Sequence, residues 1–198
     1  MKNKYAMLFS LFCLGIATAT AQYKKLLDFN GTDGANPEGS LIFSKGTLYA
    51  MTSAGGINGA GVIFSMDTGN TQYTDLLDFN FTNGVNPAGS LILSEGQLFG
   101  MTLEGGENWT SNDGNIFALH ANGTQDTNLL SFNYQNGRNP WGNLTLAGSK
   151  LYGMSYMGGA NGKGNIFSIN KNGTDYIDLY DFSGDTNGSY PTGSLTLS

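Results

Sequence analysis

The chain has 198 residues, of which 39% are apolar, 12% are charged and 30 are glycine. Nine basic residues against fifteen acidic ones argue against binding nucleic acid or anionic lipid by neutralising phosphates. A single cysteine and a single histidine exclude a disulfide framework, a Ser-His triad and Cys- or His-rich metal sites.

Residues 1–21 have the pattern of a secretory signal peptide. Lys2 and Lys4 precede an apolar run at residues 5–16, and small residues at 19–21 form a cleavage-like tail. An uncleaved anchor is the alternative, but the run is short for a membrane span. We therefore expect an exported protein, secreted or at the cell surface, with no membrane insertion after cleavage. Cleavage removes the only cysteine and two lysines, leaving seven basic against fifteen acidic residues, a net charge near −8.

The remaining residues, 22–198, are a tandem repeat. A short apolar strand, a glycine pair and an Ile-Phe pair recur in the same order at residues 48–64, 98–117 and 151–167. Four phenylalanines, 50, 53 and 50 residues apart, fix the period: Phe29, Phe79, Phe132 and Phe182. The three extra residues of the middle interval lie between Gly106 and Ile116, as expected for an insertion in a surface loop.

Each repeat is predicted to contain four short strands, a to d. In the first repeat they span residues 40–44, 47–53, 62–66 and 73–79, and they are rich in Leu, Ile, Phe, Tyr and Thr. Glycine-containing turns join a to b and c to d, which predicts tight reversals and an antiparallel meander. No run outside the first 21 residues has helical periodicity.

The pattern of strand c predicts how the meanders pack. Ile63 lies on one face of this strand and Phe64 and Met66 on the other, so both faces are apolar. Each meander is therefore expected between two others, as in the blades of a β-propeller. The sequence thus predicts an all-β, propeller-like array of four-stranded antiparallel blades.

The array has three complete blades and incomplete ends. The blades span about residues 39–79, 89–132 and 142–182, with a lone d strand at 23–29 and a lone a strand at 194–198. In units that begin at strand d, the repeats are about 23–72, 73–125, 126–175 and a partial 176–198. Three blades do not close a ring. We expect either a fragment of a longer protein, which is favoured, or open blade edges that associate with another copy.

The repeat resembles the GloVer-type tandem repeat of exported bacterial proteins. The resemblance rests on Leu-Tyr-Gly-Thr-Thr-x-x-Gly-Gly, a variable loop, and Gly-x-Val/Ile-Phe, and it covers three units and a fragment. Departures occur at three positions of this pattern: Met51, Met101 and Met154 replace the first Thr, Ala50 replaces the Gly, and Ser155 replaces the second Thr. The resemblance implies a β-propeller-like fold and supplies no catalytic residues.

Function is expected at one end of the blades. The a–b and c–d turns are tight, so the long b–c and d–a loops gather at the opposite end, the long-loop end. Four aromatic residues are predicted to lie there: Phe81, Trp109, Tyr134 and Trp141. They are expected either to stack on a sugar ring or a protein partner, or to cover the apolar interior. We expect Trp109 and Trp141 to be partly exposed on the same face.

The inserted loop suggests an alternative function. Glu104, Glu107 and Asp113 lie in or beside it and break the repeat, and two carboxylates flanking a bond are what glycoside hydrolysis requires. A glycan-active enzyme would need two of these carboxylates to converge in a cleft. These three residues and the four aromatic ones are the candidate ligand-binding set, and no catalytic residue is assigned.

Oxygen side chains at alternate positions in residues 28–34 resemble a calcium loop, but the glycine is one place late and no bidentate Glu follows. A plain turn is favoured, so no cofactor or metal is predicted and calcium is an open alternative. The sequence therefore favours an exported, non-enzymatic repeat module that binds a glycan or a protein, or acts as a surface scaffold.

Overall fold

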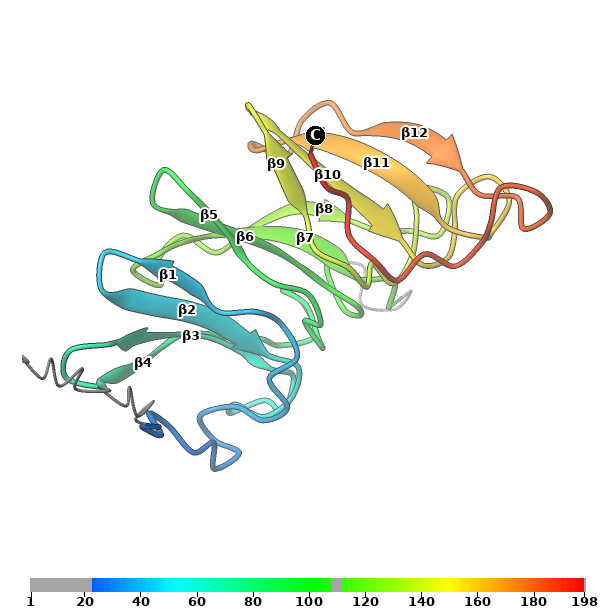
Figure 1. Ribbon diagram of the computed structural model, residues 1–198. Helices are drawn as coiled ribbons and strands as arrows, with labels where there is room; N and C mark the ends of the chain where they lie inside the picture. The colour runs from blue at the N-terminus through cyan, green and yellow to red at the C-terminus, as the bar shows by residue number, and fades with distance from the viewer. Residues whose placement is uncertain (1–22, 108–111, 198) are drawn as a thin grey trace, which may run out of the picture.

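The computed structural model describes residues 23–107 and 112–197, and within them the protein is all-β (Figure 1). The strands form three four-stranded antiparallel sheets, which we call blades 1, 2 and 3. Blade 1 contains β1 (Ile42–Ser44), β2 (Thr47–Thr52), β3 (Val62–Asp67) and β4 (Tyr73–Asp78). Blade 2 contains β5 (Ile92–Ser94), β6 (Gln97–Thr102), β7 (Asn115–His120) and β8 (Thr127–Ser131). Blade 3 contains β9 (Thr145–Ala147), β10 (Lys150–Ser155), β11 (Asn165–Asn170) and β12 (Ile177–Asp181).

Every blade is a meander in which neighbouring strands in the chain are neighbours in the sheet. The predicted strands are confirmed, with one systematic difference at the start of strand a. This strand was predicted from residue 40, but β1 begins at Ile42. The amide of Ser40 instead donates a hydrogen bond to Ser90 Oγ of the next repeat, at 2.8 Å, and so leaves the ladder.

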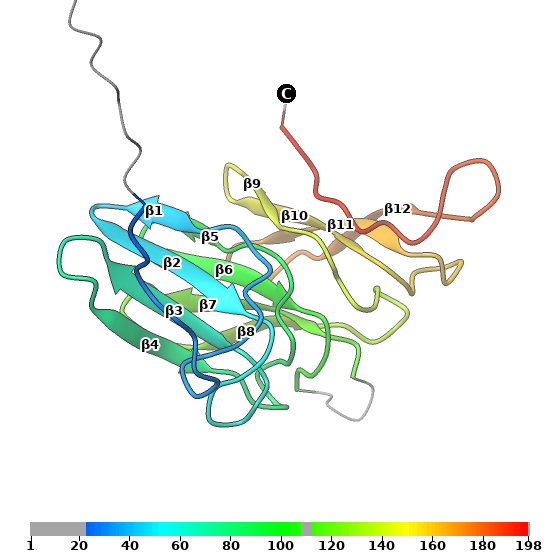
Figure 2. The same cartoon turned by 60° about the horizontal axis from the view of Figure 1, so that its bottom comes forward.

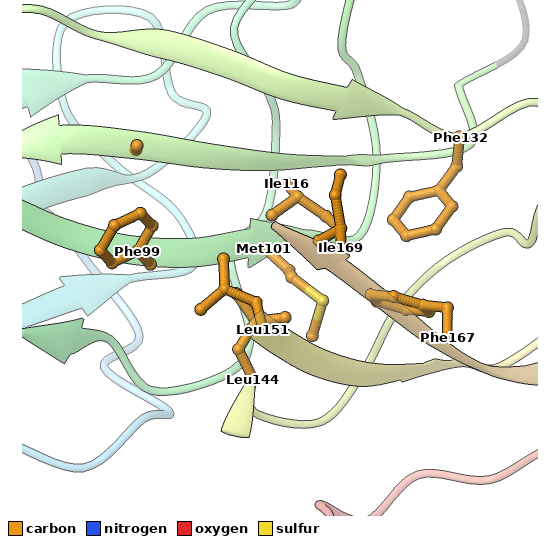
Figure 3. Close-up of a cluster of buried hydrophobic side chains, with 9 residues drawn as sticks. Phe99, Met101, Ile116, Phe132, Leu144, Leu151, Phe167 and Ile169 are labelled. Carbon is orange, nitrogen blue, oxygen red and sulfur yellow. The ribbon is translucent and has the colours of Figure 1, made fainter. Parts of the chain in front are cut away.

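The apolar core lies between the blades. Blade 2 is sandwiched between blades 1 and 3 (Figures 1 and 2), which confirms the prediction from strand c. Phe117 packs edge-on against Phe79 of blade 1, with ring centroids 5.3 Å apart. Phe167 packs in the same way on Phe132 of blade 2 at 5.5 Å, inside the cluster shown in Figure 3. Because each blade interface repeats the previous one, the array is held together mainly by contacts between neighbours.

The two ends of the array differ from the prediction. Neither residues 23–29 nor the described residues 194–197 form a regular strand. The physical reason is that a d strand pairs with strand c of its own blade and an a strand pairs with strand b, and among the described residues no such partner lies beside either segment. Phe29 nevertheless packs edge-on against Phe64 at 5.4 Å, the contact that Phe79 makes with Phe117.

Candidate binding surface at the long-loop end

The two kinds of long loop come together as the sequence predicted. Isolated β-bridges join each d–a loop to the b–c loop of the blade that follows it in the chain: Ala35 to Ala54, Val85 to Glu104 and Arg138 to Met157. The end of strand d also holds the b–c loop of its own blade. Asp78 Oδ1 accepts a hydrogen bond from the amide of Ile57 at 2.7 Å, and Asp181 Oδ1 accepts one from Ala160 at 2.6 Å. The described parts of these loops are therefore held in place by hydrogen bonds.

Backbone hydrogen bonds also tie the blades to each other at this end. The residue before the loop proline has a left-handed backbone and donates its amide to the b–c loop of the preceding blade. The three bonds are Asn86 to Ala60, Asn139 to Asp113 and Tyr190 to Lys163, at 2.8–2.9 Å. A positive φ causes little backbone strain at an asparagine. At Tyr190 the strain is larger, and this backbone conformation persists because the surrounding contacts stabilise it.

The three candidate acidic residues have different surroundings. Asp113 is 4% exposed, and its Oδ1 lies 3.0 Å from Nε of Arg138, so this ion pair links blades 2 and 3. Glu107 is exposed, with its amide donating to Ser131 Oγ at 3.1 Å. Glu104 contributes backbone to the loop bridge and is half-buried. The buried carboxylate is therefore engaged in a structural contact between blades.

The candidate aromatic residues are exposed where the structure describes them. Trp109 lies outside the described residues. Phe81 is 59% exposed, and Tyr134 and Trp141 are each 45% exposed. Each of the three rings is thus partly at the surface and partly packed against the protein.

Trp141 belongs to a row of aromatic rings on blade 3, which we call the aromatic strip: Trp141, Tyr156 and Tyr190. The ring centroids of Trp141 and Tyr156 are 6.4 Å apart, and those of Tyr156 and Tyr190 are 5.2 Å apart. Trp141 comes from the loop before β9, Tyr156 directly follows β10, and Tyr190 follows β12. Three segments distant in sequence thus present one aromatic surface.

A cation adjoins the strip. Lys163 Nζ lies 4.9 Å from the centroid of the Tyr190 ring and 2.8 Å from its hydroxyl oxygen. The hydrogen bond to Tyr190 raises the pKa of Lys163, so the ammonium group stays charged at neutral pH. The strip therefore combines flat apolar faces with a hydrogen-bond donor at one end.

The other repeats show that the fold does not require this strip. Repeat-equivalent positions carry Glu38 and Ala88 in place of Trp141, Ser53 and Leu103 in place of Tyr156, and Asn36, Asn86 and Asn139 in place of Tyr190. In blade 1 the same site is filled by a hydrogen bond from Ser53 Oγ to Glu38 Oε1 at 3.0 Å. Sequence reasoning missed Tyr156 and Tyr190. Comparing each position across the repeats would have revealed both.

The loop that resembled a calcium site is a turn closed by its own side chains. Asn30 Oδ1 accepts hydrogen bonds from the amide and hydroxyl of Thr32, at 2.9 and 2.7 Å, and Asp33 Oδ1 accepts one from the amide of Asn30 at 2.7 Å. The same arrangement recurs around Asn80. Within residues 23–107 and 112–197, no three His, Cys, Asp or Glu residues are grouped as metal ligands would be.

Blade 1 lacks a polar side-chain contact that its neighbours have directly beneath the long loops. In blade 3, Asn165 Nδ2 donates to Asp178 at 2.8 Å, but Val62 replaces this asparagine in blade 1. Burial, with the neighbouring Asp78 as a further cause, raises the pKa of the equivalent Asp75 to about 6. The folded state therefore binds this proton more tightly than the unfolded chain does.

This difference predicts that the free energy of unfolding is higher at acidic pH than at neutral pH. The contribution of Asp75 to stability is full below about pH 3.8 and is lost as the pH rises through about 6. Solvent screening limits it to about 1 kcal/mol or less. We expect Asp75→Asn to remove this part of the pH dependence, measured as the free energy of unfolding in urea between pH 4 and 7. An unchanged slope in the variant would show that Asp75 does not titrate in this range.

Three stacked four-stranded meanders with their long loops at one end define a β-propeller-type repeat protein. Two solved structures have the same fold. A chain of a nidogen/laminin complex matches with a TM-score of 0.56 and 17% identity, over 79% of this chain and 51% of that one. TolB from Acinetobacter baumannii matches with a TM-score of 0.51 and 16% identity, over 78% of this chain and 34% of that one. The chain thus spans about half or less of these relatives.

The chain belongs to the Gloeobacter/Verrucomicrobia repeat family, whose model matches residues 7–125 and 107–198. This confirms the resemblance seen in the repeat motif. A search of curated proteins gave no match. Over the described part of the chain, no helix has the length and apolar character needed to cross a membrane.

Proposed function

We propose that this protein is an exported, non-enzymatic β-propeller module that binds a glycan on the aromatic strip of blade 3. The observation that carries the proposal is the strip itself. It joins Trp141, Tyr156 and Tyr190 within 5.2–6.4 Å, and the other repeats do without it. The signal-like residues 1–21 support export.

The chemistry of the strip suits a sugar. The apolar faces of pyranose rings stack on exposed aromatic side chains, and Tyr190 and Lys163 add polar groups that can bond hydroxyls. Trp141 is 45% exposed and Tyr190 38%, so each side chain has surface that a ligand can contact. The net charge near −8 favours a neutral glycan over an acidic one.

The enzyme alternative receives no support from the described contacts. Asp113, the buried carboxylate of the candidate set, is paired with Arg138 across the blade interface. A general acid or base needs a carboxyl group that is accessible to the substrate.

A glycan screen tests the proposal. Residues 22–198 are expected to bind one class of neutral glycan in the screen. Trp141→Ala is expected to weaken that binding about tenfold, because one aromatic contact with the sugar is lost. Phe81→Ala is the matched control, because Phe81 is exposed at the same end but has no ring contact with the aromatic strip to which the proposal assigns binding. Failure to bind any glycan, or equal binding by wild type and Trp141→Ala, would reject the proposal. Binding of a protein alone would identify the strip as a protein interface.

A further inference from the structure

Tyr134 places a fourth aromatic ring beside the aromatic strip. Its hydroxyl group lies against the b–c loop of blade 3, since a Cβ built on Gly162 would lie 2.7 Å from Tyr134 Oη. Gly162 directly precedes Lys163, whose Nζ lies 4.9 Å from the centroid of the Tyr190 ring. The carbonyl oxygen of Tyr134 also accepts a hydrogen bond from the amide of Gly159 in this loop, at 2.8 Å. Tyr134 is therefore held beside the end of the strip that carries the cation.

The backbone of Tyr134 is strained in a way that the fold does not require. Its φ is +66°, in the left-handed region that favours glycine. Two repeat-equivalent residues, Gly31 and Gly184, are glycines with φ of +95° and +88°, and the third, Phe81, does not have a positive φ. Tyr190 shows the same pattern, because its φ is +55° and the other repeats have asparagine at its position. Backbone strain of this kind clusters at ligand-binding sites, so ligand binding explains both tyrosines better than the fold does.

The rings of the strip are tilted rather than coplanar. The planes of Trp141 and Tyr156 differ by 52°, and those of Tyr156 and Tyr190 by 38°. A flat crystalline polysaccharide can stack on coplanar rings, but it meets only one ring of a tilted set. A single chain in solution can rotate about each glycosidic bond, so successive sugars can face successive rings. The centroid separations of 6.4 and 5.2 Å are comparable to the length of one sugar residue.

We propose that the ligand is a single linear chain of neutral sugars that lies along the surface from Trp141 to Tyr134, with about one sugar on each of the four aromatic rings. This inference rests on the proposed function, because it assigns the class of glycan to the same site. The hydroxyl groups of Tyr134 and Tyr190 and the ammonium group of Lys163 bond sugar hydroxyls at one end of the bound chain. The site therefore recognises consecutive sugars within a chain rather than one terminal sugar.

Chain length tests this proposal. The probes are β-1,4-linked oligosaccharides of glucose, mannose, xylose or N-acetylglucosamine and α-1,4-linked oligosaccharides of glucose, with one to six sugars, titrated into residues 22–198 by calorimetry. In one series the affinity is expected to rise about tenfold or more from two sugars to four, and then to level off, because each added sugar gains an aromatic ring. Equal affinity for the monosaccharide and the hexasaccharide would overturn the proposal. Binding only of branched glycans or terminal sugars in the screen would overturn it as well.

Tyr134→Gly tests the fourth ring without introducing a residue that the fold rejects, because glycine occupies two of the equivalent positions. The variant is expected to weaken binding of the hexasaccharide about tenfold. Binding of the disaccharide is expected to be unchanged, since two sugars can still occupy Trp141 and Tyr156. Phe81→Gly is the matched control, because it makes the same change at an equivalent position that has no ring contact with the strip. An equal loss for both chain lengths, or no loss for either, would overturn the role of Tyr134.

Insoluble polysaccharides test the consequence of the tilted rings. Residues 22–198 are expected to remain in the supernatant after centrifugation with microcrystalline cellulose or crystalline chitin. Co-sedimentation with either crystal, in place of binding to soluble chains, would overturn the single-chain assignment and leave the proposed function intact. Failure to bind any glycan, soluble or insoluble, would instead reject the proposed function itself.

Discussion

Replacing Phe117 with alanine is expected to destabilise the protein by about 3–5 kcal/mol. Phe117 is fully buried in the middle blade, and its ring lies edge-on against Phe79 of blade 1. Truncation leaves a cavity where two blades meet, and the neighbouring sheets are too rigid to collapse into it. The free energy of unfolding, from urea denaturation followed by circular dichroism, measures the loss.

Phe81→Ala is the matched control for this experiment. Its side chain is 59% exposed, so the same substitution is expected to change stability by less than about 0.5 kcal/mol. Equal losses in the two variants would show that the interface between blades 1 and 2 does not hold the array together.

The second large effect is expected at Gly61, in the b–c loop of blade 1. Gly61 has φ of +102°, and a Cβ there would overlap the carbonyl oxygen of Thr52 and press on Pro87 of the next repeat. Both atoms belong to the backbone or to a rigid ring, so neither can move away cheaply. Gly61→Ala is expected to cost at least about 3 kcal/mol, measured by the same denaturation.

Gly59 in the same loop separates the two causes of this loss. It also has positive φ, at +73°, but a Cβ there would meet nothing within 4 Å. Gly59→Ala is therefore expected to cost only the left-handed strain, about 1–2 kcal/mol. Comparable losses at Gly59 and Gly61 would mean that the close approach to Thr52 contributes nothing.

The strands of the blade were predicted well because the copies of the repeat can be aligned with one another. Residue composition and the bounding turns predicted the strands, and apolar residues on both faces of strand c required neighbouring sheets, as the buried residues of β7 confirm. The three-residue insertion before Ile116 was placed in a loop for the same reason. What failed was the strand at residues 23–29. It has the composition of a d strand, but a strand needs a hydrogen-bonding partner, which composition does not provide.

The candidate site was predicted less completely. Loop length located the long-loop end, and Trp141 was found because tryptophan in a loop is conspicuous. Tyr156 follows a strand and Tyr190 precedes a proline, so each looked like part of the scaffold. Their association depends on how three loops fold over blade 3, as does the pairing of Asp113 with Arg138.

By itself, the sequence determined the repeat, the order of the strands, the two-sided packing of the blades and the end at which the loops gather. These properties are local or periodic, so they can be read along the chain. Only the tertiary structure decided which loop side chains come together and which carboxylate is engaged in an ion pair. Those depend on contacts between residues 15 to 34 positions apart, where small differences between repeats change the partner.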